Sequence, residues 1–393
     1  MKDQLKYFPV NWIDGMKINK NHFIAQDNAW NNALADTAAL NLSPVHFGVL
    51  PASVAGEDNF SVSISVDNQG TLRASVRSCQ AVTSGGVRIS LPSSAESNSD
   101  GVPAASFDFK VSGSEAVYWI VLTANPFERI PAGSPDVSED PPRYPNVIPS
   151  YKLQVISASQ YGQFAGNPYA LTVGKVRVNG NDIRVDEEYI PPTYSVSANP
   201  DLLALHGELD HYLSTLELRS TQIVQKIFKK SQQNDLSELV MFLCDRVMLF
   251  IGQTITDFRW SAVHDTPAKL FSSIAGLSRV MKNTIDLRIG SGKEELMNYL
   301  SEWCDLNQGE LENLFTTVAN MRYDNNDINS NIGDTVRFVK VTGKLFDTLA
   351  NLEFIGKRKD SGIFVKEEPR YSAGPAQQSN VEQPKPKRRF FGS

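Results

Sequence analysis

The stretch Tyr189-Ile190-Pro191-Pro192, followed closely by Asn199-Pro200, decides the fold because the hydrophobic period changes there. Before it, Ile183-Arg184-Val185 alternates as a β-strand does. The two prolines remove backbone donors and so end a sheet. Asn199 is a capping residue and Pro200 suits the first helical position, so a long leucine-rich helix is predicted to begin here. The sequence therefore predicts an α+β protein, with a β-rich first half and a helical second half.

The first half carries several strand patterns. Phe60–Val66 alternates strictly, Asp67–Gly70 supplies a turn, and Leu72–Val76 alternates again, which predicts a β-hairpin. The run Ala116–Leu122 is apolar on both faces, so we expect a central strand. Asn179-Gly180 is typical of a tight hairpin turn, since both residues tolerate positive φ.

Two further segments complete this half. Asn21–Leu40 repeats apolar residues at helical spacing and predicts one amphipathic helix. Asn125–Pro149 holds many prolines, so we expect a long connecting loop. Residues 1–190 are thus predicted to form a β-sandwich-like shell domain bearing one helix.

Beyond a Pro-rich linker at 191–200, residues 201–356 are predicted to form an antiparallel bundle of five helices. The later helices are expected at Leu236–Thr256, Thr266–Gly290, Lys293–Met321 and Ile332–Leu352. A near-heptad seam on the first helix suits packing in a bundle or between protomers, which leaves trimer contacts and an intrachain core both open. The seam residues are Leu202, Leu205, Leu209, Tyr212 and Leu216.

Composition excludes several classes of function. A net charge of -6 argues against a dedicated nucleic-acid binder. No signal-peptide core and no apolar run of about 18 residues is evident, so we expect a cytoplasmic protein. The three cysteines have no metal-ligand spacing, and the five histidines form no HxxxH pair. Gly290-Ser291-Gly292-Lys293 fails the phosphate-loop pattern, because Glu294 follows the lysine. The sequence predicts no enzyme activity, no cofactor and no metal site.

The C-terminal residues 357–393 are rich in Lys, Glu, Pro, Gln and Ser and are predicted to be mostly disordered. Their end combines cations with aromatic rings, at Lys387, Arg388, Arg389, Phe390 and Phe391. This end fits a short docking peptide, a solvated terminus, or a weak anchor for an anionic membrane or nucleic acid.

One N-terminal pattern is shared with a known family. Val10–Met16 is followed by His22-Phe23 and by a helix carrying Asp27, and this order resembles the N-terminal signature of the TssK baseplate proteins of type VI secretion systems. Thr266–Leu277 is similar to that family's His-Pro segment, with Thr266 in place of the histidine. The positions that match the N-terminal signature are Trp12, Gly15, Met16, His22, Phe23 and Asp27.

The resemblance implies a non-enzymatic homotrimer that connects the baseplate wedge, made of TssF-type and TssG-type proteins, to a membrane-anchored complex. It implies that the signature residues support the shell and its wedge contact, and that the protein is cytoplasmic and docks at the inner membrane. About forty mostly polar residues follow the last predicted helix, which is too few for the family's usual C-terminal head domain, so we expect this sequence to depart from the family there. Either the basic-aromatic tail replaces it, or the membrane partners differ, as in the divergent Bacteroidota-type systems.

Two other classes remain open from the sequence. The alternative to a secretion baseplate is a receptor-binding or adaptor protein of a phage tail or contractile injection machine, whose free end would bind a cell-surface glycan. A cryptic enzyme would instead bring scattered histidines or carboxylates together in a pocket.

Overall fold

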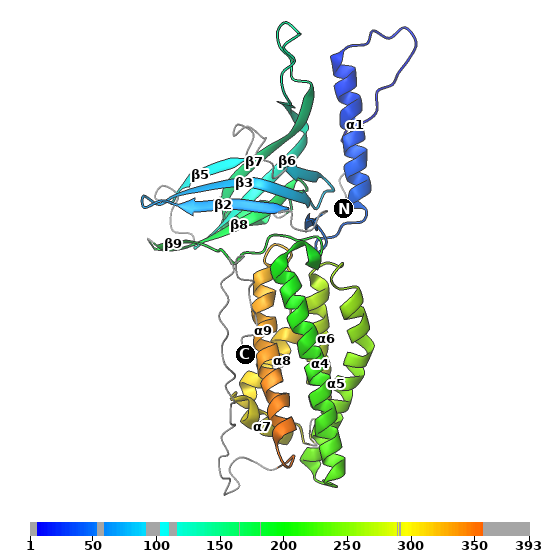
Figure 1. Cartoon of the computed structure of the whole chain (residues 1–393), viewed down its shortest axis with the longest axis vertical. Coiled ribbons are helices and arrows are strands. Elements are labelled where there is room, and N and C mark those ends of the chain that lie inside the picture. Colours follow the sequence, from blue (N-terminus) through cyan, green and yellow to red (C-terminus); the bar gives the residue numbers. More distant parts are fainter. Residues whose placement is uncertain are drawn as a thin grey trace, which may run out of the picture. The chain divides into compact units, whose positions relative to one another are not determined.

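The computed structural model describes residues 6–52, 59–91, 103–109, 116–164, 166–180, 182–288, 290 and 292–356. The chain divides into two compact units (Figure 1). The β-sheet unit comprises Met1–Asn199, His264–Ala268 and Tyr323–Ser330, and the helical unit comprises Pro200–Val263, Lys269–Arg322 and Asn331–Ser393. The predicted α+β class is confirmed by two antiparallel sheets followed by helices.

The elements follow the order that the sequence patterns indicate. In the β-sheet unit they are α1 (Lys20–Ala39), β1 (Gly48–Val49), β2 (Phe60–Val66), β3 (Thr71–Val82), β4 (Arg88–Leu91), β5 (Ala104–Asp108), β6 (Val117–Ala132), β7 (Asn146–Ser157), α3 (Ala158–Phe164), β8 (Ala170–Asn179), β9 (Asp182–Val185) and the 3₁₀ turn η2 (Val196–Ala198). The helices that follow are α4 (Pro200–Lys229), α5 (Asp235–Trp260), α6 (Ala268–Asp286), α7 (Lys293–Cys304), α8 (Gln308–Ala319) and α9 (Ile328–Asn351).

Two antiparallel sheets enclose one core. In the first sheet, β3 pairs with β1, β2, β4 and β5. The second sheet has the order β7-β6-β8-β9. Alternate residues of β3 and β6, such as Leu72 and Ile120, are fully buried in the same apolar cluster, so the sheets pack face to face as a sandwich.

The predicted central strand is confirmed as β6, which pairs with β7 on one side and β8 on the other. Its apolar residues serve two cores because successive side chains point to opposite faces. Ile120 and Leu122 enter the core between the sheets, whereas Trp119 and Val121 enter a second cluster on the outer face. Helix α3 covers this outer face through Tyr161, which stacks on Trp119 with ring centroids 4.6 Å apart.

The prediction of a long loop over Asn125–Pro149 is wrong. Strand β6 continues to Ala132 and β7 begins at Asn146, so both strands extend as a two-stranded ribbon. The pairing of β6 with β8 ends at Thr123, which leaves each ribbon strand with a free edge. A register shift between Asn125 and Arg129 takes up Pro126. Free edges and bulges are the positions where a sheet tolerates proline.

Of the predicted linker 191–200, residues 191–199 belong to the β-sheet unit, and Pro200 begins α4. The backbone N–H of Val49 donates to the carbonyl of Pro192, and Thr193 forms a parallel bridge with Val49. Thr193 and Val196 are fully buried. The chain also passes between the units more often than a single linker requires, after Asn199, Val263, Ala268, Arg322 and Ser330.

In the helical unit, α4 contacts both α5 and α9. Helices α4 and α5 run antiparallel, because Asp210 bonds to Arg259 while Thr221 bonds to Met248. Among the described residues, one helix, α5, is long and apolar enough to cross a membrane by length and composition alone. In the helical unit its residues Val240 and Val247 are buried in the bundle core.

The single helix predicted over Lys293–Met321 is two helices, α7 and α8. Asp305 adopts φ +57°, which ends α7, and Asn307 begins α8 with a capping box. In this box the side chain of Asn307 accepts from the backbone N–H of Glu310 at 2.9 Å, and Glu310 accepts from the N–H of Asn307 at 3.0 Å. The Asn-x-x-Glu spacing was the available signal for the break.

The approach of β1 to Pro192 can be tested at Gly48. An alanine Cβ there would lie 2.0 Å from the carbonyl oxygen of Pro192, at a φ of +128°. We expect Gly48→Ala to lower the free energy of unfolding by about 3 kcal/mol or more. Gly180→Ala is the control, since its φ is +62° but no atom lies within 4 Å of the added Cβ, and about 1 kcal/mol is expected. Chemical denaturation measures both, and equal losses would contradict the close approach.

Candidate docking surface

The N-terminal signature folds back along α1. The backbone N–H of Val10 donates to Gln26 Oε1 at 3.1 Å, which ties the segment to the helix. The ring of Trp12 lies 6.1 Å from the ring of His22 and 6.2 Å from that of Phe23. The residues of the sequence pattern are therefore neighbours in space.

Local hydrogen bonds explain two of the signature positions. Gly15 has φ +79° in the turn in which the N–H of Met16 donates to the carbonyl of Ile13 at 3.2 Å. His22 occupies the third position of α1 and its Nδ1 accepts from the backbone N–H of Asn19 at 3.3 Å, which completes a capping box. Gly15 and His22 thus set the direction in which the segment enters α1.

Helix α1 exposes its large apolar side chains. Of its 20 residues only Ala29 is buried. The aromatic and leucine side chains expected to face a core are exposed instead, Phe23 by 58%, Trp30 by 62% and Leu34 by 66%. The apolar row of this helix therefore faces away from the core of the unit.

A groove of about 610 Å³ is lined by residues of α1 and of the β6–β7 ribbon. Trp30 and Leu34 line the α1 side, and Val147 and Ile148 of β7 line the ribbon side. Gly86, which also lines the groove, has φ +80°. A Cβ added to Gly86 would lie 2.1 Å from the carbonyl oxygen of Ala35, so the backbone of α1 is in direct contact with the turn at Gly86. We name the groove together with Trp12 and Phe23 the α1 surface.

The charged side chains at the groove already have partners within the unit. Arg129 of β6 forms an ion pair with Asp27 at 3.1 Å, and it donates to the side chain of Asn28 at 3.0 Å. Arg88 donates to the carbonyls of Ala81 and Ile89 and to a glutamine side chain. Asp27 and Arg129 neutralise each other, and the hydrogen bonds of Arg88 are made within the unit, so the groove offers mainly apolar contact to a ligand.

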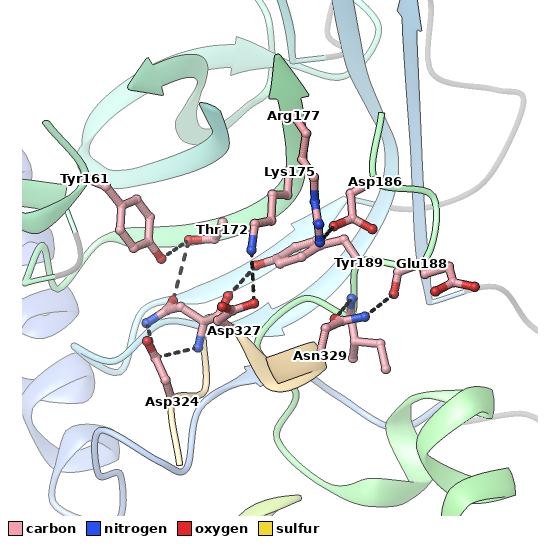
Figure 2. A network of polar contacts seen from close by, with 12 residues as sticks. Tyr161, Thr172, Lys175, Arg177, Asp186, Glu188, Tyr189, Asp324, Asp327 and Asn329 are labelled. Carbon is pink, nitrogen blue, oxygen red and sulfur yellow. Dashed lines mark hydrogen bonds and ion pairs between the residues drawn. The ribbon is translucent and has the colours of Figure 1, made fainter. Parts of the chain in front are cut away.

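A second feature, a buried polar network, was not found from the sequence (Figure 2). Lys175 of β8 is 8% exposed, its Nζ lies 3.1 Å from Asp327, and it lies 4.5 Å from the ring centroid of Trp119. The hydroxyl of Tyr189 donates to the carbonyl of Asn326 at 3.0 Å, and the side chain of Asn329 accepts from the N–H of Ile190 at 2.9 Å. The network holds the loop Tyr323–Ser330 against β8 and the segment after β9.

The geometry of this network suits support rather than catalysis. Burial raises the pKa of the Tyr161 hydroxyl to about 12, and burial raises the pKa of Tyr189 well above its usual value, so both stay protonated near neutral pH. The cavity beside Tyr161, Thr172 and Asn326 measures about 10 Å³, which is room for one water molecule and no substrate. The Asx-rich run Asp324–Asp327 was the available sequence signal, because such residues form local turns.

The other ionisable candidates are also built into the core. All three cysteines are buried and free, and burial raises the pKa of Cys79 and of Cys244 to about 12, which keeps both thiols protonated and unreactive. In the described part of the chain, no group of three or more His, Cys, Asp or Glu side chains is arranged to hold a metal ion.

The seam residues of the first long helix lie inside the single chain. Leu202, Leu205 and Leu209 are 0% exposed, Leu216 is 1% exposed, and Tyr212 is 7% exposed. The Tyr212 hydroxyl also bonds to Thr342 of α9 at 2.7 Å. This burial favours the intrachain core over trimer contacts for these five side chains. The tail candidates Lys387, Arg388, Arg389, Phe390 and Phe391 lie outside the described residues.

Comparison with known proteins gives structural matches alone. No protein-family model matches the sequence, and no curated protein matches it significantly. A crystal structure of TssK is 14% identical, with a TM-score of 0.46, over 86% of this chain and 69% of that one. TssK in the type VI secretion TssK–TssF–TssG baseplate subcomplex is 16% identical, with a TM-score of 0.42, over 85% and 99% of the two chains. TssK from the EAEC system, bound to a nanobody, is 16% identical with a TM-score of 0.39, over 83% and 96%.

The supporting role of the buried network can be tested at Lys175. Lys175→Met removes the cation and leaves Asp327 without its counterion, so we expect the free energy of unfolding to fall by about 2 kcal/mol. Adding Asp327→Asn should recover part of this loss, which a double-mutant cycle measures as a coupling energy.

The matched control is the exposed pair Arg184–Asp182, where Arg184→Met should cost less than about 0.5 kcal/mol. Denaturant unfolding at neutral pH gives all four values. Additive effects of the Lys175 and Asp327 substitutions would contradict a coupled ion pair.

Proposed function

We propose that this protein is a structural, non-enzymatic baseplate component of a type VI secretion system. It acts as a trimeric connector that links the baseplate wedge to a membrane-anchored complex. Its partners are further copies of itself, wedge proteins of the TssF and TssG type, and proteins of the membrane complex. It works in the cytoplasm and docks at the inner membrane when the baseplate is assembled.

The observation that carries this proposal is the position of the N-terminal signature. Its residues, which resemble those of TssK proteins, gather on and beside α1 rather than in a core. A helix of 20 residues that buries one side chain gains little stability from its own packing. The exposed apolar row of α1 therefore fits a helix that a partner covers in the assembly.

The chemistry of the α1 surface supports a protein partner over a small substrate. The groove is open and largely apolar, and its Arg129 and Asp27 are paired with each other. Such a site fits an apolar helix or extended segment of another protein, which we assign to the wedge. Protonated buried thiols and a nearly closed cavity at the buried network support the non-enzymatic assignment.

The contact with the membrane-anchored complex is assigned to a different part of the chain from the wedge contact. The basic-aromatic tail, with Lys387, Arg388, Arg389, Phe390 and Phe391, is our candidate for it. Three cations beside two aromatic rings suit an acidic and apolar surface on a membrane-complex protein.

Wedge docking can be tested by co-expression with the TssF-type and TssG-type proteins of the same organism. The full-length chain should co-purify with them. Trp30→Glu combined with Leu34→Glu places two charges in the groove, so we expect recovery of the wedge proteins to fall at least tenfold. Quantitative pull-down from one lysate volume measures the change.

Leu287→Glu is the matched control, because Leu287 is 75% exposed but belongs to the helical unit. It should leave wedge recovery unchanged, and both variants should keep the far-UV circular dichroism of the unmodified chain. Failure of the unmodified chain to bind the wedge proteins would overturn the proposed function. Full binding by the groove variant would overturn the assignment of the α1 surface alone.

A further inference from the structure

Two arginines of the helical unit lie over one aromatic ring. The guanidinium carbon of Arg246 is 4.9 Å from the centroid of the Phe242 ring, and that of Arg288 is 4.6 Å from the same centroid. Phe242 and Arg246 are four residues apart on α5, which places them on one face of the helix. Arg288 lies in the turn that follows α6. A guanidinium that stacks on a ring keeps N–H donors at its edge for an acceptor.

The backbone around Arg288 is fixed by its neighbours. The N–H of Arg288 donates to the carbonyl of Ile285 at 3.0 Å, and its carbonyl accepts from the N–H of Lys293 at 3.0 Å. Lys293 is the first residue of α7. A Cβ added to Gly292 would lie 2.9 Å from Cδ1 of Leu239, so the start of α7 is in direct contact with α5. The packing of α5, α6 and α7 therefore brings the two arginines together.

Neither arginine has a close counterion within the described residues. Arg288 forms no ion pair there, and its Nε is buried without a hydrogen-bond partner. Asp286, two residues earlier, already binds two lysines. Arg246 reaches only Asp245, at 3.9 Å, and adjacent residues of a helix do not face each other. The outer N–H groups of both guanidinium groups are therefore available to an acceptor from another molecule.

Two other arginines of the helical unit show the paired arrangement. Arg219 binds Asp347 at 2.6 Å, and Arg259 binds Asp210 at 2.7 Å. Each of these pairs joins two helices of the same chain. Arg288 is partly buried as well but has no such partner. An anion bound beside it is screened less by water than one bound at a fully exposed cation, so the contact is stronger.

The surroundings of the arginines favour a protein segment over a membrane or a nucleic acid. Glu238, one turn before Phe242, and Asp245 are both exposed. Anionic membranes and phosphate backbones are bound by wider basic clusters, which these carboxylates interrupt. A segment with one or two carboxylates can contact the arginines alone. Leu287, next to Arg288, is 75% exposed and offers an apolar contact to such a segment.

We propose that Arg246 and Arg288, held over Phe242, bind the carboxylates of an acidic segment of a partner protein. The parallel N–H donors of each guanidinium match the two oxygens of a carboxylate. The site belongs to the helical unit, whereas the α1 surface belongs to the β-sheet unit. The inference therefore adds a contact separate from the wedge contact and does not depend on it.

The test measures the binding of a synthetic peptide to the purified full-length chain by fluorescence anisotropy. The probe is dye-labelled Glu-Glu-Leu-Phe-Glu-Glu, and the comparison peptide has Gln in place of every Glu. We expect the acidic peptide to bind about tenfold more tightly, with an affinity that falls as salt rises, because the contact is between charges. Equal affinities for the two peptides, or no detectable binding of the acidic one, would overturn the proposal.

Two double variants separate charge from geometry. Arg246→Met combined with Arg288→Met removes both cations, and we expect the acidic peptide to bind about tenfold more weakly. Arg246→Lys combined with Arg288→Lys keeps the charges but loses the planar donors, so a loss of several-fold is expected. Full affinity in the methionine variant would contradict the site, and full affinity in the lysine variant would contradict recognition by the guanidinium groups.

The matched control is Arg337→Met combined with Lys340→Met. It removes two exposed cations that lie one turn apart on α9. Its affinity for the acidic peptide should equal that of the unmodified chain, and every variant should keep the far-UV circular dichroism of that chain. An equal loss in the control would show a general effect of net charge and would overturn the site.

Two further measurements test other occupants. Vesicles of phosphatidylcholine and phosphatidylglycerol should sediment equal amounts of the unmodified chain and of the methionine variant. Less sedimentation of the variant would assign the arginines to a membrane and overturn the protein partner. Light scattering should give the same mass for both proteins, and a lower mass for the variant would assign the arginines to a contact between copies and overturn the proposal.

Discussion

The buried ammonium group of Lys175 is the constraint on which the β-sheet unit depends. A cation among apolar neighbours in a strand loses its hydration, so it requires a counterion and a further favourable contact. Asp327 and the ring of Trp119 supply these, and Asp327 comes from a loop far along the chain. Once that loop is held, Asn329 fixes the backbone of Ile190, and the residues that follow pair with β1. One desolvated charge thus orders three distant segments.

Local patterns predict the parts of this fold whose determinants are local. The alternation in Phe60–Val66, the turn at Asn179-Gly180 and the two-faced apolar run of β6 each lead to the observed strands. The length of the β6–β7 ribbon is not predicted. Proline is costly in a strand that is paired on both sides and tolerated on a free edge, and the sequence does not show which edge is free. The Lys175–Asp327 contact joins residues 152 apart, and no local rule identifies such partners.

For the candidate site, the spacing of apolar residues in the sequence predicts that a helix has an apolar face. The spacing does not predict whether the chain itself or a partner covers that face. Trp30 and Leu34 recur as core residues do, yet they are exposed on α1. Leu205 and Leu209 show a comparable repeat and are buried by the chain itself. The difference arises from neighbours that are distant in sequence. Grouping of the N-terminal signature could be predicted, because its residues lie within one turn and one helix.

The membership of Tyr323–Ser330 in the β-sheet unit links folding to the order of synthesis. Lys175 leaves the ribosome 152 residues before Asp327. At translation rates of about 5–20 residues per second, the strand waits roughly 8–30 s for its counterion. During that time α4 to α8 are made, so the first unit to begin folding is completed only after most of the second has emerged. A chain cut after Asn199 would lack this loop, and with it the counterion of Lys175.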